Sequence, residues 1–173
     1  IEPLGGLLDV APNLNRLSEE GIFFTHCYAN SFRTDRGTVC TLSGYLGLPT
    51  VSVMKIPTKS RTLPAISEEL VKAGYQTDFL YGGDINFTNM KSYLLSKGYQ
   101  HLTADTDFSL AERNSNVWGV NDDITSEWLL NHLKQRSDKE TPWFTTYLTL
   151  SSHEPFDVPY SRLEEKIPNA FAY

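Results

Sequence analysis

Apolar residues recur along the chain with two different spacings, and the two alternate. Spacings of three and four residues predict helices over residues 12–20, 36–44, 63–73, 89–96 and 122–135. Short runs of apolar and β-branched residues predict strands over residues 22–28, 76–81, 99–103 and 143–150. The last run is uninterrupted, which is typical of a buried strand. Strands that alternate with helices indicate an α/β fold, with a mostly parallel sheet flanked by helices.

The chain is expected to be one incomplete domain. Its 173 residues are a typical length for a single domain. No internal repeat, low-complexity stretch or linker divides it. It begins with Ile-Glu-Pro-Leu-Gly-Gly, which reads as a loop already in progress. We therefore interpret residues 1–173 as part of a longer protein.

The composition of the chain limits the kinds of molecule that it is expected to bind. The chain is 40% hydrophobic and 21% charged, which is ordinary for a globular domain. Its formal net charge is −6, whereas nucleic-acid-binding domains are usually basic, so no nucleic-acid partner is expected. No run reaches the roughly 18 apolar residues of a membrane span. Cys27 and Cys40 do not form a disulfide framework or a metal motif, and we interpret them as buried thiols.

Ligands of open α/β sheets bind beyond the carboxyl ends of the strands, and a polar segment follows the predicted strand 22–28 there. In this segment Thr34 lies between Arg33 and Arg36, just before a predicted helix. Guanidinium groups and a helix N-terminus both favour an anion. Thr34 is therefore a candidate nucleophile or anion contact. The alternative is an N-cap, a common role for Thr before a helix.

Two more polar segments follow predicted strands. Gly82-Gly83 is followed by Asp84 and Asn86, which could contact a ligand. The alternative is a strand-to-helix turn capped by Thr88 or Asn89. Ser151-Ser152-His153-Glu154-Pro155-Phe156 follows the strand 143–150, where His153 could contact an oxyanion or a leaving group. The alternative is a structural histidine.

Residues 11–21, Ala-Pro-Asn-Leu-Asn-Arg-Leu-Ser-Glu-Glu-Gly, resemble the "TPNLDRLAxEG" helix of sulfatases and their relatives in the alkaline phosphatase superfamily. In sulfatases a strand follows, then a Cys or Ser nucleophile, then a helix that ends in Thr-Gly. Here Ser43-Gly44 lies at the spacing of that Thr-Gly, which puts Thr34 at the nucleophile position. The sulfatase Cys-x-Pro-x-Arg signature is absent.

A Thr nucleophile is similar to that of the phosphoglycerol transferases of the lipoteichoic acid synthase family. Residues 81–87, 118–120 and 150–156 also resemble that family, in the same order, so the resemblance spans almost the whole chain. The family's glycerol-phosphate contacts in the glycine-rich block are His, Trp and Arg. Their approximate counterparts here are Tyr81, Thr88 and Met90, which suggests a different substrate.

The resemblance implies a divalent metal ion as cofactor, Mn²⁺ in the first place, with Mg²⁺, Ca²⁺ and Zn²⁺ as alternatives. Thr34 would be the metal ligand of this stretch. The family's other ligands, an acidic residue after a first strand and a late Asp-His pair, would lie outside this chain. The piece by itself is therefore expected to be inactive.

By the same resemblance, the intact enzyme transfers phosphoglycerol or a related phosphoryl group from a lipid donor through a covalent Thr34 intermediate. Arg33, Arg36, Asp84, Asn86 and His153 would bind the substrate. The intact enzyme would sit in the cell membrane of a bacterium, anchored by segments absent here, with this domain on the extracytoplasmic side. The rival interpretations are a hydrolytic sulfatase or phosphodiesterase on the same fold, and a non-catalytic anion-binding module.

Overall fold

The computed structural model describes residues 2–6 and 10–155. In this part of the chain three strands, β1 (Gln76–Tyr81), β2 (His101–Thr103) and β3 (Trp143–Leu148), form a sheet with the order β2-β1-β3. Both neighbours of β1 run parallel to it. The predicted α/β fold with a parallel sheet is thus confirmed.

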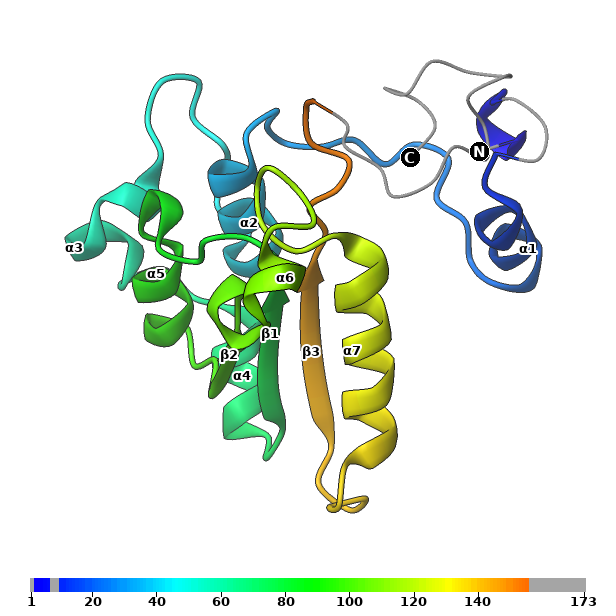
Figure 1. Cartoon of the computed structure of the whole chain (residues 1–173). Coiled ribbons are helices and arrows are strands. Elements are labelled where there is room, and N and C mark those ends of the chain that lie inside the picture. The colour runs from blue at the N-terminus through cyan, green and yellow to red at the C-terminus, as the bar shows by residue number, and fades with distance from the viewer. Residues whose placement is uncertain (1, 7–9, 156–173) are drawn as a thin grey trace.

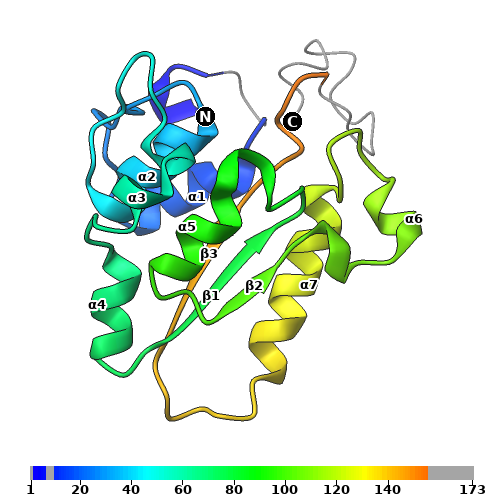
Figure 2. The ribbon, with the colours of Figure 1, turned by 90° about the vertical axis from the view of Figure 1, so that its left-hand side faces the viewer.

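Helices cover both faces of the sheet (Figures 1 and 2). On one side lie α2 (Thr34–Ser43), α4 (Ile66–Lys72) and α5 (Met90–Ser96), and on the other lies α7 (Asp122–Gln135). Shorter helices are α3 (Pro57–Ser60), α6 (Leu110–Arg113) and the 3-10 turns Glu2–Leu4, Val53–Lys55, Phe87–Asn89 and Asp105–Asp107. The helix α1 (Pro12–Glu20) buries none of its residues and lies away from the sheet in Figure 1.

The alternation of side chains along β1 divides the core in two. Phe79 packs with α2 and α5 residues such as Val39 and Leu94. Its neighbour Leu80 points the other way, into a smaller cluster with Val120 that Ile124, Trp128 and Leu129 of α7 complete. Successive residues of a strand face opposite sides, so the central strand is the element that holds both helical layers together.

Predicted element boundaries are accurate where the sequence period is strong. The elements expected over residues 12–20, 76–81 and 122–135 have these same bounds in the structure. The helix expected over 36–44 begins earlier, at Thr34, and the strand expected over 143–150 ends at Leu148. That strand is half-buried instead of buried, because within the described residues it forms the edge of the sheet, and β1 is the buried strand.

The strand predicted over residues 22–28 is wrong. This segment is irregular, and Ile22, Phe24 and Tyr28 are exposed. A short apolar run becomes a strand only where a sheet edge accepts its backbone hydrogen bonds, and none of the three described strands pairs with it. Cys27 is consequently exposed, and Cys40 is partly exposed, so the expectation of two buried thiols is also wrong.

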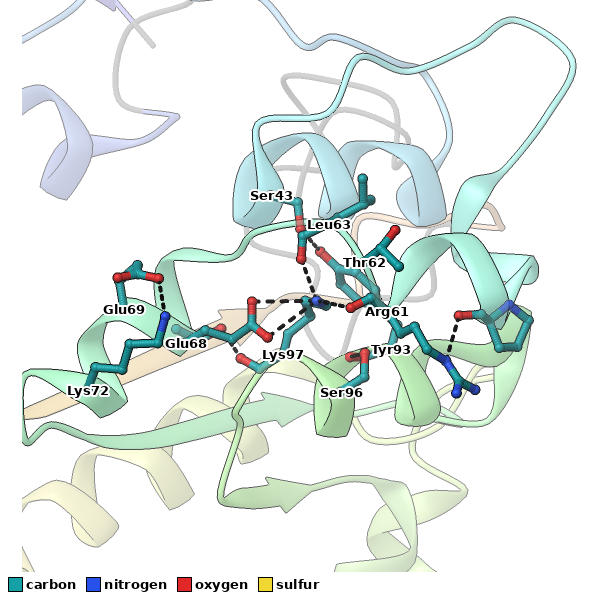
Figure 3. Close-up of polar contacts among 12 residues, drawn as sticks. Ser43, Arg61, Thr62, Leu63, Glu68, Glu69, Lys72, Tyr93, Ser96 and Lys97 are labelled. Carbon is teal, nitrogen blue, oxygen red and sulfur yellow. Dashed lines mark hydrogen bonds and ion pairs between the residues drawn. The ribbon is translucent and has the colours of Figure 1, made fainter.

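A buried ammonium group ties together the segments on the α2 side of the sheet. The side chain of Lys97, just after α5, is fully buried. Its Nζ donates to the carbonyl oxygens of Arg61 at 3.0 Å and Leu63 at 2.5 Å, and lies 3.4 Å from the Glu68 carboxylate (Figure 3). Ser67 Oγ donates to the Lys97 carbonyl at 2.5 Å. Lys97 therefore joins α5 to α4 and to the loop that precedes α4.

Replacing this ammonium group should destabilise the protein. Lys97→Met keeps an apolar stem but leaves the two carbonyl oxygens and Glu68 without their cation. We expect the free energy of unfolding to fall by about 3 kcal/mol, because buried partners of a removed charge stay desolvated. Urea unfolding of the intact protein measures the loss.

The matched control is Lys72→Met on α4. Lys72 lies 2.7 Å from Glu69, but both side chains are about two-thirds exposed (70% and 68%) (Figure 3). A solvent-exposed pair of this kind contributes little, so the change should stay below about 0.5 kcal/mol. Equal effects of the two substitutions would mean that the Lys97 contacts do not stabilise the fold.

Candidate active site

The site lies where β1 and β3 end. These strands pair in register, so that Tyr81 is opposite Leu148 at their carboxyl ends. The segments that follow, residues 82–90 and 149–154, therefore leave the sheet at the same level. The N-terminus of α2 lies at this same end of the sheet (Figure 1). Three segments far apart in the sequence thus meet at the place where α/β proteins bind ligands.

A cavity of about 570 Å³ opens between these three segments. Four of the predicted site residues line it: Arg33, Thr34, Asp84 and His153. Arg36 and Asn86 are not among its lining residues. The rest of the lining is Phe32, Asp35, Tyr81, Phe87, Thr88, Met90, Trp118 and Leu150.

Thr34 is exposed and is the first residue of α2. The N-cap is Arg33, because its carbonyl oxygen accepts the first helical hydrogen bonds, from Arg36 N at 3.1 Å and Gly37 N at 2.9 Å. The interpretation of Thr34 as the N-cap is therefore wrong. Its hydroxyl lies beside the unpaired N–H groups of the first helical turn, which favour an anion. Thr34 also lines a second cavity, of about 400 Å³, between α2 and β3.

The charges around Thr34 are partly balanced by a buried acid that the sequence analysis missed. The Asp35 side chain is 4% exposed and lies 3.8 Å from Arg33 Nε and 4.0 Å from Lys55 Nζ. Neither contact is close enough for a hydrogen bond. Arg33 itself is half exposed and so faces both Asp35 and the cavity. Arg36 points elsewhere, since its NH1 donates to the carbonyl oxygen of Pro49 at 2.6 Å.

The turn after β1 holds Asp84 at the cavity. Asp84 Oδ1 accepts hydrogen bonds from the backbone N–H of Asn86 at 2.8 Å and from its side-chain amide at 3.1 Å. Asn86 therefore orients the carboxylate, although its own side chain does not line the cavity. Thr88 and Asn89 follow with positive φ angles of 56° and 68°.

Asn89 is the N-cap residue of α5, as the turn interpretation expects, but its side chain makes no capping hydrogen bond to the helix. Instead Asn89 Nδ2 donates to the Met54 carbonyl at 3.0 Å. A β-branched residue with positive φ is strained by roughly 1–3 kcal/mol. The anchoring of Asn89 to Met54 stabilises this conformation, in which Thr88 lines the cavity.

His153 is held by an aromatic neighbour that lies far from it in sequence. Its ring lies 4.4 Å from the Trp118 ring, centroid to centroid, at an angle of 54°. The indole Nε1 of Trp118 donates to the carbonyl oxygen of Glu154 at 2.7 Å. Trp118 thus contacts both His153 and the backbone that follows it. Phe156, the last residue of the predicted histidine segment, lies outside the described residues.

A carboxylate at the N-terminus of α7 fixes the start of the His153 segment. The two oxygens of buried Asp122 accept the N–H groups of Leu150 at 2.7 Å and Ser151 at 2.9 Å. Ser151 Oγ in turn accepts the backbone N–H of Asp122 at 2.8 Å and donates to Asn121 Oδ1 at 3.2 Å. These reciprocal bonds attach the end of β3 to α7, and His153 follows two residues later.

Glycines allow the loops behind the cavity to cross. Val120 N donates to the Gly82 carbonyl oxygen at 2.8 Å, and a Cβ on Gly119 would overlap that same oxygen. A Cβ on Gly83 would meet the ring of Tyr81 at 2.7 Å, so Gly83 leaves the space that this ring fills. Burial raises the pKa of Tyr81, and the carboxylates of Asp84, Asp105 and Asp122 raise it further.

The described residues do not by themselves fit a metal ion. Between residues 2–6 and 10–155, no three His, Cys, Asp or Glu side chains are arranged to hold one. Thr34 contributes a single hydroxyl oxygen, and a catalytic ion needs several ligands. The metal ligands other than Thr34 that the resemblance implies lie, by that expectation, outside this chain.

Comparisons with known proteins agree with this architecture. The crystal structure of a protein in the alkaline phosphatase superfamily from Vibrio parahaemolyticus has a TM-score of 0.85 and 28% sequence identity, over 99% of this chain and 43% of that one. The lipoteichoic acid synthase LtaP from Listeria monocytogenes has a TM-score of 0.82 at 16% identity, over 94% of this chain and 42% of that one, and this likeness concerns the fold alone.

The curated relative Phosphoglycerol transferase I of Salmonella arizonae is 25% identical over 162 residues, which are 85% of this chain and 20% of that protein. The chain therefore spans about a fifth of this relative and less than half of each solved chain. No helix in the described part of the chain has both the length and the apolar character that a membrane crossing needs.

The chain shares its fold with a solved protein of the alkaline phosphatase superfamily at 28% sequence identity, and this superfamily is its class. Residues 4–170 match the family described as Sulfatase, and the chain belongs to that family. The family resemblance seen in the sequence is thus confirmed.

Asp35 and Asp122 were not predicted from the sequence as residues of the site, and Trp118 was predicted only as part of the family resemblance. Each of these side chains acts through a contact with a distant segment or a neighbouring charge, which no local pattern reveals. The one available signal was the position of Asp35, next to the candidate nucleophile.

Asp122→Ala should loosen the segment that carries His153. The buried N–H groups of Leu150 and Ser151 would lose their acceptors, so we expect amide hydrogen exchange over residues 149–154 to accelerate at least about tenfold. Hydrogen–deuterium exchange with mass spectrometry measures this. The control is Asp123→Ala, an exposed acid in the same helical turn with a similar effect on the helix dipole. Unchanged protection in Asp122→Ala would remove the carboxylate from this positioning role.

Proposed function

We propose that this chain carries the nucleophile and part of the substrate site of a phosphoester enzyme, which transfers phosphoglycerol or a related phosphoryl group from a lipid donor. The observation that supports this most is the position of Thr34. Its hydroxyl is exposed at the N-terminus of α2, on a cavity that Arg33 and His153 also line. The name of the Salmonella arizonae relative supports the phosphoglycerol substrate.

The proposed reaction has two displacements. Thr34 Oγ attacks phosphorus as its hydroxyl proton passes to water, the bond between phosphorus and the leaving oxygen breaks, and protonated His153 donates a proton to that oxygen. An acceptor hydroxyl then attacks the phospho-threonine and gives its proton back to His153, and the released Thr34 oxygen takes up a proton from water. Arg33 and the N–H groups of the first turn of α2 bind the nonbridging oxygens and stabilise their charge.

Enzymes of the superfamily typically depend on a metal ion. The divalent ion expected from the resemblance, Mn²⁺ in the first place, remains a prediction, as do its ligands outside this chain. The roles given above to Thr34, Arg33 and His153 are binding, nucleophilic attack and proton transfer. An extracytoplasmic location on a bacterial membrane likewise remains part of the proposal.

Hydrolysis of a sulfate ester or phosphodiester is the second candidate, and the family description Sulfatase favours it. The two reactions share the first displacement and differ in whether water or another hydroxyl attacks afterwards. Product analysis of the intact protein with a lipid donor separates them, because transfer yields a new ester and hydrolysis yields a free phosphate or sulfate.

Thr34→Ala in the intact protein should lower turnover at least about 1,000-fold, since the attacking oxygen is removed. Thr34→Ser keeps a hydroxyl and should retain measurable turnover. The control is Thr38→Ala, one turn further along α2, which lines only the second cavity. Release of the donor's alcohol measures the rates. Turnover of Thr34→Ala within tenfold of wild type would favour a site that binds anions without this nucleophile.

A further inference from the structure

The lining of the cavity offers two kinds of chemistry. Arg33, Thr34 and His153 suit a phosphate. The second group of lining residues, which we call the acidic-aromatic half, consists of the carboxylate of Asp84, the rings of Tyr81, Phe87 and Trp118, and the neighbouring Thr88 and Met90; its Trp118 is in contact with His153. Arg33 is the only Lys or Arg among the described residues that line the cavity. Of the two carboxylates in the lining, Asp35 lies near Arg33 and Lys55, so the group attached to the phosphate would meet the negative charge of Asp84 and several aromatic surfaces.

The charge of Asp84 is not neutralised by a neighbour. In the described part of the chain its carboxylate has no ion pair, and its hydrogen-bond donors come from the neutral Asn86. The nearby Asp105 differs, because Arg113 NH2 lies 2.9 Å from it. Burial raises the pKa of Tyr81 most, and the carboxylates of Asp84 and Asp105 raise it further, so negative charge lies near this wall. Such charge favours a cation.

The aromatic rings of this half remain partly uncovered. Phe87 is 57% exposed and Trp118 is 45% exposed, although both line a cavity. Aromatic faces attract alkylammonium groups, and clusters of rings bind quaternary ammonium ligands. Open rings and an unpaired carboxylate that line one cavity thus offer both contacts that such a cation needs.

A hydroxyl-rich group fits this half less well. Hydroxyl oxygens need donors as well as acceptors. Trp118 Nε1 already donates to the Glu154 carbonyl, Thr88 Oγ1 is directed at the Met54 sulfur at 3.7 Å, and Met90 offers no donor. Tyr81 is the remaining side-chain donor of the half, whereas an ammonium group needs acceptors and aromatic faces alone.

We infer that the phosphate ester bound in this cavity carries an alkylammonium group of the ethanolamine or choline type. Its cation lies against Asp84 and the rings of Tyr81, Phe87 and Trp118, while its phosphate faces Thr34. The inference rests on the proposed function, which supplies the phosphate half, but it replaces glycerol by a cationic group.

Two esters of the same shape test the charge. In p-nitrophenyl phosphocholine the headgroup carries a quaternary nitrogen, and in p-nitrophenyl 3,3-dimethylbutyl phosphate a carbon replaces it. With the intact protein, we expect kcat/KM to be at least about tenfold higher for the choline ester. Asp84→Asn should bring this ratio close to one. Asp123→Asn, which removes an exposed acid outside the cavity, should leave the ratio as in wild type.

A binding measurement keeps the two proposals distinguishable. Intact protein with Thr34→Ala, which lacks the attacking oxygen, is titrated calorimetrically with phosphocholine, 3,3-dimethylbutyl phosphate and glycerol 3-phosphate. We expect phosphocholine to bind at least about tenfold more tightly than the other two. Equal affinities, or a preference for glycerol 3-phosphate, would overturn the cationic headgroup even if Thr34 proves to be the nucleophile. A preference for phosphocholine in a protein that cleaves neither ester would support the headgroup and refute the reaction.

Discussion

The parallel pairing of β1 with β3 is the constraint on which the rest of the site depends. Because Tyr81 lies opposite Leu148, both strands end at one level, and the loops that follow them leave the sheet at the same edge. Asp122 then ties the end of β3 to α7 through two backbone N–H groups. A slip of the strands by one residue would turn every side chain of β3 to the other face. The distance between His153 and α2 would change with it.

Electrostatics at the start of α2 adds a second requirement. The positive potential at the first turn of a helix attracts anions. Here the carboxylate of a buried acid, Asp35, already offsets part of this potential. Arg33 and Lys55 lie near its two oxygens without forming hydrogen bonds. Both cations are therefore held near Asp35 without a short ion pair to it. A phosphate that enters the cavity can recruit Arg33 without breaking a short ion pair.

Local patterns were sufficient for much of the fold and for part of the candidate site. Residues 76–81 and 122–135 have strong periods, so their bounds were predictable, and the rule about strand ends directed attention to Thr34, Asp84 and His153. The strand over 22–28 failed because a strand needs a partner edge, which local sequence does not contain. The roles of Trp118 and Asp122 were not predicted for a similar reason, since their hydrogen bonds join residues that are 36 and 28 positions apart in the chain.

Thr34 and most of the acidic-aromatic half belong to different parts of the chain. The proposed reacting group is therefore separate from the residues proposed to bind the headgroup. Thr34 is placed by α2, whereas Asp84 and Thr88 belong to the turn after β1, which Asn89 anchors to the Met54 carbonyl. Substitutions in that turn can alter the binding of a headgroup without moving Thr34. Family membership therefore identifies the position of the reaction more firmly than its substrate. The carboxylate of Asp84, which no described cation pairs, is the feature that sets the headgroup preference argued for this chain.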